Sequence, residues 1–429
     1  MSLPVLVVKI YQNQKLLLTF IFLLSLFVST VFLFVLGNVG PVEHGVPGSD
    51  YSGFYKPLAE NILAGKGFIL GDGKNIDAPG YPFFLALIFL LARFLQIGEL
   101  QLIVFFNLLL TAVSACLLYL LAKHLFDKKI ALVASFLWLT YPFSLWFIKN
   151  PNTEVPFIVL FFLGLWLYLS ALKKEQIRLI FLTGLILGVA ALVRPSAWLF
   201  VVLAIIIFLL TSWNKSNLRI SLTKRIGLVT FLIIGALVII LPWEVYVFSE
   251  TGRLIPLATG GGAAMVDGLT FGLRTGAAGD QVVLPGDVLA LMERAKGESL
   301  LTIPQVLQFL GTELVEEPLA FFKLIGLKIL RSWYATSQMW WEGRILLVQL
   351  VYLSSGLAGL IYSLRRYKEK IKEIIFMLAV ISYFWALAII ALSILRYMVP
   401  AMGLVFIFSA IFAVALIERL VKNSKTPSL

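Results

Sequence analysis

Long apolar stretches alternate with short polar segments along the whole chain. A helix of roughly 20 apolar residues crosses the ~30 Å hydrocarbon core of a bilayer, so this pattern predicts membrane-spanning helices. The first stretch follows Lys9 and Lys15 and lacks the short core and small-residue cleavage site of a secretory signal, so we expect an uncleaved span. The ten predicted spans cover residues 16–36, 100–122, 130–148, 154–172, 178–193, 196–211, 227–247, 345–364, 373–393 and 397–419.

One further apolar stretch, residues 80–97, is only marginally long enough to span, and charge decides its placement. If it lies along the outer membrane surface, the segments on the side of the N-terminus contain 20 Lys and Arg but only 5 acidic residues. Positive residues gather on the cytoplasmic side of membrane proteins, whereas a crossing at 80–97 would turn these segments outward. We therefore predict an interfacial or re-entrant helix there, ten spans, and cytoplasmic N- and C-termini.

Composition supports a polytopic membrane protein and narrows the chemistry. The 429 residues are 60% hydrophobic and 14% charged, whereas soluble domains have about 25% charged residues. The net charge of +12 does not indicate nucleic-acid binding, because basic residues lie between apolar stretches and no aromatic-basic groove module is present. Cys116 is the only cysteine and His44 and His124 are far apart, which excludes a disulfide framework and a histidine-based zinc motif.

Two large regions are predicted to face outward, residues 37–99 and 248–344. The glycines at 259–268 predict a mobile loop rather than a phosphate cradle, because no strand-turn-helix context surrounds them. The segment at 318–334 mixes basic and apolar residues and predicts a second surface-lying helix. The predicted parts of the chain are a transmembrane catalytic module at 1–247 that includes the first outer loop, a large outer loop at 248–344, and C-terminal spans at 345–429.

Three acidic residues lie at the outer ends of predicted helices. Asp50 begins a segment in which apolar residues recur at helical spacing, so it could simply cap that helix. Asp77 precedes Pro-Gly-Tyr-Pro, and Glu154 lies at the outer mouth of a span. Their shared position favours a functional site, for which Asp50 is the leading candidate.

Two arginines lie in nearly loop-free outer connections. Arg194 precedes Pro195 between two predicted spans, and Arg396 precedes Tyr397 between the last two. Charges near hydrocarbon are costly, so these side chains either snorkel to lipid headgroups or bind a substrate. A guanidinium suits bidentate binding of a phosphate. Together with the carboxylates, the arginines predict a substrate that has a lipid tail, a phosphate and a group to be transferred.

Short motifs occur in order along residues 16–415, and their spacing is more specific than any one of them. They are Ser49-Asp50-Tyr51, residues 59–68, Ala78-Pro-Gly-Tyr-Pro82, Thr153-Glu154, Arg194-Pro195, Leu241-Pro-Trp243 with Gly252, and Arg396-Tyr-Met-Val-Pro400. Together they resemble the GT-C glycosyltransferases, in particular the group of protein O-mannosyltransferases and lipid A aminoarabinose transferases.

This resemblance implies an all-α bundle of about ten transmembrane helices with extracytoplasmic juxtamembrane helices. It also implies transfer of a sugar, on the extracytoplasmic side, from a polyprenyl-phosphate-linked donor to a hydroxyl of an acceptor protein, lipid or glycan. A carboxylate beside that hydroxyl can take its proton as the bond forms. The implied roles are catalysis for Asp50, as the base, and Glu154; acceptor orientation or support for Asp77 and Tyr81; and donor phosphate binding for Arg396, Arg194, Lys56 and Tyr397. Lys56 is equally well explained as a solvated lysine.

Three questions stay open at the level of sequence. The outer carboxylates could hold a divalent ion, but arginines can bind the phosphate, so we expect no required cofactor. Ala78 stands where some relatives have a basic residue, so the sugar is not inferred. A lipid flippase or transporter and a non-catalytic envelope assembly protein are the alternatives, although transporters are expected to have ionisable residues near mid-membrane and inverted repeats.

Overall fold

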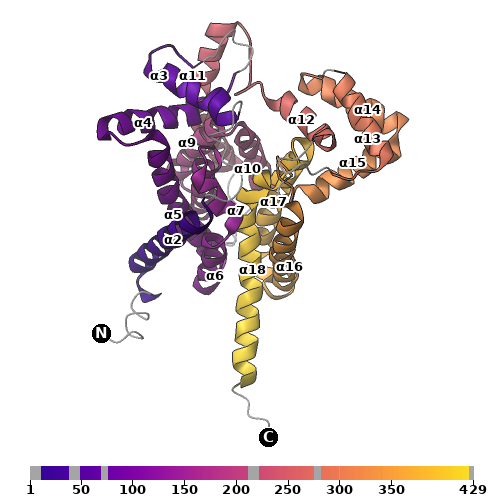
Figure 1. Ribbon diagram of the computed structural model, residues 1–429. Coiled ribbons are helices and arrows are strands. Elements are labelled where there is room, and N and C mark those ends of the chain that lie inside the picture. The colour runs from indigo at the N-terminus through magenta and orange to yellow at the C-terminus, as the bar shows by residue number, and fades with distance from the viewer. Residues whose placement is uncertain are drawn as a thin grey trace. The chain divides into compact units, whose positions relative to one another are not determined.

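The computed structural model describes residues 11–37, 49–68, 76–210, 222–274, 282–298, 300–339 and 341–424, and these residues form helices and connections without any strand. The predicted all-α class is therefore confirmed. The chain forms two compact units (Figure 1). The first contains Met1–Leu257 and Ala410–Leu429, and the second contains Ala258–Ser409.

Seven helices in the described part of the chain are long and apolar enough to cross a membrane, which confirms a multi-pass membrane protein. They are α2 (Gln14–Leu36), α5 (Glu99–Leu125), α8 (Glu154–Lys174), α11 (Leu222–Thr251), α16 (Glu342–Arg366), α17 (Ile371–Ile390) and α18 (Leu395–Ser424). An eighth span results if α6 (Lys128–Leu139) is joined to the short helices α7 (Pro142–Leu145) and η3 (Trp146–Lys149), across a bend of 52°.

The other two predicted spans are helical but shorter than the seven candidate spans. They are α9 (Ile177–Val193) and α10 (Trp198–Leu210), joined by the short helix η4 (Pro195–Ala197). Arg194 has an extended backbone, with φ −145° and ψ 107°, because the residue before a proline is forced out of the helical region. The Arg194-Pro195 junction therefore ends α9 and sets a charged residue between two apolar helices.

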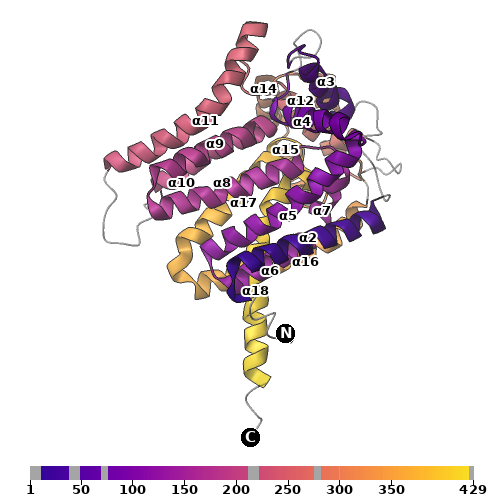
Figure 2. The same ribbon diagram turned by 90° about the vertical axis from the view of Figure 1, so that its left-hand side faces the viewer.

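The helices of the first unit pack as neighbours in the order α11, α9, α8, α5 and α2, with α6 also on α5 (Figure 2). Small residues allow the close approach of α9 and α11. A Cβ on Gly184 would lie 2.3 Å from the carbonyl oxygen of Leu232, and one on Gly188 would lie 2.9 Å from Cβ of Ile239. Such small-residue contacts replace the hydrophobic driving force that is missing between helices in lipid.

Short helices between α2 and α5 pack at one end of this unit. A π-helical turn, η2 (Tyr51–Tyr55), continues into α3 (Lys56–Leu63), and both contact α4 (Gly80–Leu95). The helix predicted at 80–97 is thus present, and it is shorter than the seven candidate spans. Single π-turns inside helices are rare overall, but those that occur often lie at functional sites.

The second unit contains a cluster of short helices. One of them shows that the prediction of a mobile loop at 259–268 is wrong. Residues Gly261–Leu269 form α12, because Met265 and Leu269 are buried in the core of this cluster and outweigh the low helix propensity of the glycines. The other members are η5 (Phe271–Leu273), α13 (Gly286–Gly297), α14 (Ile303–Glu316) and α15 (Pro318–Arg331).

The helix predicted at 318–334 is present as α15, but two of its basic residues, Lys328 and Arg331, are buried. Lys328 is 1% exposed, and its Nζ donates to the carbonyl oxygens of Gly268 (3.0 Å) and Ala391 (2.9 Å). Burial lowers the pKa of Lys328 to about 7. The lysine therefore joins α12 and α15 to the connection that leads into α18 and Arg396.

Candidate functional site

Asp50 lies at the start of the π-turn with an exposed side chain. Its carboxylate accepts no capping hydrogen bond from the helix. The hydroxyl of Ser49 takes that role instead, since Ser49 Oγ accepts a hydrogen bond from the backbone N–H of Ser52 at 3.3 Å. The interpretation of Asp50 as a helix cap is therefore wrong, and the carboxylate does not serve to complete the first turn.

Asp77 interacts electrostatically with Asp50 although 27 positions separate them in the chain. The pKa of Asp77 is raised to about 6, first because its carboxyl is largely buried and second because the Asp50 charge repels its ionised form. Asp77 therefore holds a proton more readily than a solvated aspartate does, and a carboxyl whose pKa lies near the working pH suits acid-base catalysis.

An Asp77→Asn variant should be more stable than the wild type at pH 7. The pKa of Asp77 rises from 3.8 to about 6 on folding, so between these pH values the folded state binds a proton that the unfolded state has released. The free energy of unfolding of the wild type therefore falls as this group ionises with rising pH. Above pH 6 the total loss reaches about 3 kcal/mol. Asparagine does not titrate, so chemical unfolding of the variant should lack this fall. An identical pH dependence in both proteins would contradict the raised pKa.

Gly80 brings the Asp77 segment against the end of α9. A Cβ on Gly80 would lie 2.6 Å from the carbonyl carbon of Leu192 and 2.7 Å from the backbone nitrogen of Val193. Only glycine fits between these backbones without a shift. The Pro-Gly-Tyr-Pro motif therefore lies beside the backbone that immediately precedes Arg194.

A Gly80→Ala variant should be destabilised by about 1–3 kcal/mol, since the added methyl group must displace backbone atoms rather than a flexible side chain. The transfer rate should fall with it, because α4 and the Asp77 segment would move away from α9. Thermal unfolding in detergent and a transfer assay measure the two effects. Gly227→Ala is the matched control, because a Cβ at Gly227 meets nothing within 4 Å. Equal unfolding temperatures for Gly80→Ala and the wild type would show that the contact is not tight.

Glu154 and Arg194 form a buried ion pair. Arg194 donates from one guanidinium nitrogen to Glu154 Oε1 at 2.6 Å, and the Glu154 side chain is fully buried. The guanidinium also lies 5.8 Å from the ring centre of Phe157. The snorkelling alternative for Arg194 is thereby wrong, because its charge is directed at a carboxylate inside the protein.

Lys56 and Tyr81 make contacts among the short helices η2, α3 and α4 and the start of α5. Lys56 Nζ lies 3.8 Å from Glu60 and 3.9 Å from Glu99, so its charge is shared between two acids. The buried ring of Tyr81 packs edge-on against Tyr55, with ring centres 5.0 Å apart. Tyr81 therefore joins the start of α4 to the π-turn that follows Asp50.

The sequence interpretation missed a buried polar segment that leads to Glu154. Lys149, Asn150, Asn152 and Thr153 are all buried. Asn107 on α5 holds this segment, since its Nδ2 donates to the carbonyl oxygens of Ile148 (3.1 Å) and Asn150 (3.2 Å). The one signal in the sequence is the run Asn-Pro-Asn-Thr directly before the acid.

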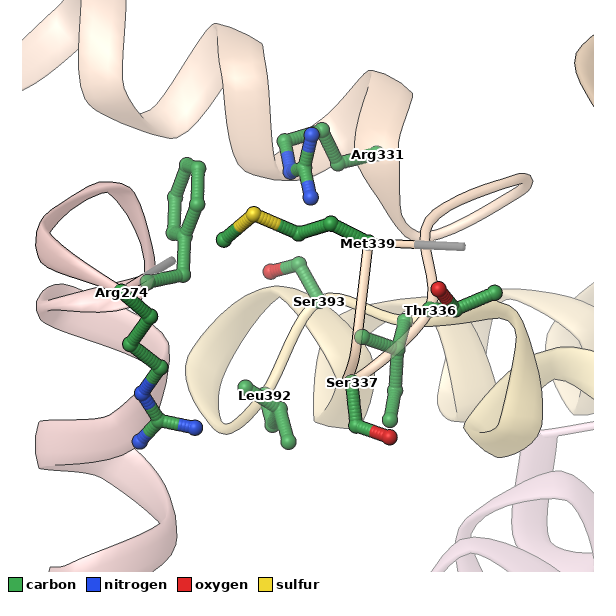
Figure 3. Close-up of a pocket in the computed structure, with 9 residues that line it drawn as sticks. Arg274, Arg331, Thr336, Ser337, Met339, Leu392 and Ser393 are labelled. Carbon is green, nitrogen blue, oxygen red and sulfur yellow. The ribbon is translucent and has the colours of Figure 1, made fainter. Parts of the chain in front are cut away.

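Arg396 and Tyr397 lie at the start of α18 in the second unit, where both are partly buried. The segment before them lines a small pocket in which the side chain of Met339 extends beneath Arg331 (Figure 3). Arg331 forms a two-pronged ion pair with Glu342, at 2.9 and 3.0 Å. The pocket residues are Phe271, Arg274, Arg331, Thr336, Ser337, Met339, Leu392, Ser393 and Ile394.

Within the described ranges, no three His, Cys, Asp or Glu residues are grouped as metal ligands. Asp50 and Asp77 supply two interacting carboxyls, and Mg²⁺ is usually bound by one or two carboxylates together with water and substrate phosphates.

Residues 76–246 match the family model of dolichyl-phosphate-mannose-protein mannosyltransferases. The matched range includes Asp77, Tyr81, Glu154 and Arg194, and it covers less than half of the chain. Asp50 and Arg396 lie outside it. No curated protein sequence matches the chain.

The fold is similar to that of solved oligosaccharyltransferases from the archaeon Archaeoglobus fulgidus. One, AglB in complex with an inhibitory peptide and a dolichol-phosphate, matches with a TM-score of 0.57 and 13% identity, over 97% of this chain and 52% of that one. A second, tethered to an acceptor peptide with the NVT sequon, matches with a TM-score of 0.51 and 14% identity, over 95% and 50%. A third, in complex with Zn and sulfate, gives 0.54 and 14%, over 93% and 49%.

This chain therefore spans about half the length of the solved proteins that it matches. The likeness establishes the fold, and residues 76–246 are similar in sequence to the model of a mannosyltransferase family. The predicted resemblance to the GT-C glycosyltransferases is thus confirmed.

Proposed function

We propose that this protein is a glycosyltransferase that moves a sugar from a polyprenyl-phosphate-linked donor to an acceptor hydroxyl at the extracytoplasmic face of the membrane. One observation carries the proposal: three interactions involve acidic and basic segments of the first unit that lie far apart in the chain. Asp50 acts on Asp77, the Asp77 segment packs through Gly80 on the end of α9, and Arg194 pairs with Glu154.

The proposed reaction is a substitution at the anomeric carbon of the donor sugar. The acceptor oxygen forms the new glycosidic bond, the bond from the anomeric carbon to the phosphate oxygen breaks, and its electron pair stays on the lipid phosphate. Asp50 takes the acceptor proton, since a hydroxyl attacks poorly unless a base removes its proton as the bond forms. Asp77, with its pKa of about 6, assists by holding the acceptor or sharing that proton.

Arginine would offset the charge that develops on the leaving phosphate. Arg396 is the proposed principal phosphate ligand. The Arg194 guanidinium is already hydrogen-bonded to Glu154, so in this proposal it places Glu154 and adds a nearby positive charge. Because arginine side chains would bind the phosphate, we propose that transfer needs no resident metal ion. Addition of a metal chelator should therefore leave the transfer rate unchanged.

The comparisons support this class of reaction. The matched family model describes mannosyltransferases that act with dolichyl-phosphate-mannose, and one similar structure contains a dolichol-phosphate. Carried over as a proposal, these descriptions suggest a lipid-phosphate donor for this chain as well. The large outer region at 248–344 would select the acceptor.

The test compares membranes from cells with and without this protein. Glycans of the cell envelope are analysed by mass, and the transfer of labelled sugar from endogenous lipid-linked donors is followed in isolated membranes. The proposal predicts a glycan that disappears with the protein and a transfer activity that returns with it. If the protein only moves lipid-linked sugars across the membrane, isolated open membranes will transfer sugar equally well without it.

A further inference from the structure

Asn152 is a buried polar residue that the proposed chemistry does not use. It is 1% exposed, and within the described part of the chain neither its Oδ1 nor its Nδ2 has a hydrogen-bond partner. Each buried polar group left unpaired costs roughly 1–3 kcal/mol. Since about 90% or more of buried polar groups in native proteins are paired, this amide calls for a partner from outside the chain.

Asn152 lies close in the chain to the candidate site. It lies two residues before Glu154, whose carboxylate binds Arg194. The backbone just before it is held by the two hydrogen bonds from Asn107. These bonds fix which end of the Asn107 amide is the donor, so its Oδ1, also buried and without a partner in the described residues, is an unused acceptor.

The unused groups define the chemistry of the missing partner. Asn152 offers one acceptor and a donating NH₂ group. A phosphodiester has no hydrogen to give to the amide oxygen, and a cation would leave the NH₂ group unpaired. Hydroxyl groups both donate and accept. A neutral molecule that carries several hydroxyls, such as a sugar ring, is therefore the matching class.

We propose that Asn152 is a substrate-binding residue that hydrogen-bonds hydroxyl groups of a sugar ring beside Glu154. This inference rests on the proposed function, because it takes the sugar to be that of the donor or of a glycan acceptor. The unpaired amide then destabilises the free protein, and it gains its hydrogen bonds only when substrate binds.

The test is an Asn152→Leu variant, since leucine has the same number and branching of side-chain heavy atoms but no polar group. Transfer in native membranes should fall about 10- to 30-fold, as expected for the loss of two hydrogen bonds. The unfolding temperature should stay the same or rise, because an unpaired amide has been removed. Asn107→Leu is the comparison, since it breaks two hydrogen bonds that the free protein makes and should lower the unfolding temperature.

Two results would overturn the proposal. Wild-type transfer by Asn152→Leu would show that the amide does not touch substrate. A fall in its unfolding temperature as large as that of Asn107→Leu would show that a trapped water already pairs the amide. Failure of the proposed function is a separate result, because the wild-type protein would then add no transfer to membranes that lack it.

Ligand binding to the purified protein then shows whether Asn152 binds the sugar of the donor or that of the acceptor. The affinities of a polyprenyl phosphate and of the same lipid carrying mannose are compared for the wild type and Asn152→Leu. If the variant loses the affinity that mannose adds, the amide binds the donor sugar. If both proteins show the same difference between the two lipids, the hydroxyls belong to the acceptor, and the acceptor KM of the variant should rise instead.

Discussion

An Asp50→Asn variant is expected to transfer sugar about 10²–10⁴-fold more slowly than the wild type, with an almost unchanged unfolding temperature. Asparagine keeps the size and shape of the side chain but cannot take a proton from the acceptor hydroxyl. Stability should be retained because the carboxylate is exposed and Ser49, not Asp50, caps the turn. The initial rate of transfer in native membranes measures the loss.

The control for this variant is Glu250→Gln, which neutralises an exposed acid at the end of α11. It should leave the rate unchanged. The pH profile gives a second check, since removing the Asp50 charge takes away one of the two causes of the raised pKa of Asp77. The acidic limb of the remaining activity should therefore move to lower pH. Full activity in Asp50→Asn would exclude Asp50 as the base.

The hydrophobic pattern was sufficient to locate the helices but not their lengths or breaks. Every predicted span is helical, because each one must satisfy its own backbone hydrogen bonds in lipid. The segment at 259–268 was mispredicted because local glycine content favours a loop, whereas burial of Met265 and Leu269 in a cluster formed mainly by residues between 288 and 324 favours α12. Tertiary burial of this kind leaves no signal within the segment itself.

The sequence marks Glu154 and Arg194 as charges at the ends of apolar stretches, but it does not predict that they pair. Charges at the ends of apolar stretches reveal Glu154 and Arg194, since such charges are costly near hydrocarbon. That they bind each other depends on the packing of α8 against α9, across 40 positions of the chain. Likewise, nothing in the local pattern indicates that Asn152 is buried without a partner or that Gly80 touches the backbone of Leu192.

Arg194→Ala should be the most destabilising of the substitutions considered, by about 3–5 kcal/mol. The change leaves the carboxylate of Glu154 fully buried without the guanidinium that offsets its charge. Removing one partner of a buried ion pair exposes the other to the full cost of desolvation. Thermal or chemical unfolding in detergent measures the loss. Arg178→Ala is the matched control, because Arg178 lies at the start of α9, the helix that ends just before Arg194, with an exposed side chain, and should be neutral.

Joint replacement of the pair separates its structural role from its catalytic role. Two apolar residues of similar size often replace a buried ion pair without loss of stability, so Glu154→Leu combined with Arg194→Leu should regain most of what Arg194→Ala loses. Transfer should not return with it, because the site would lack both the Glu154 carboxylate and the Arg194 guanidinium. An active double variant would reduce the pair to a structural contact, and an unstable one would show that its hydrogen bonds, rather than its charges, hold α8 to the α9 junction.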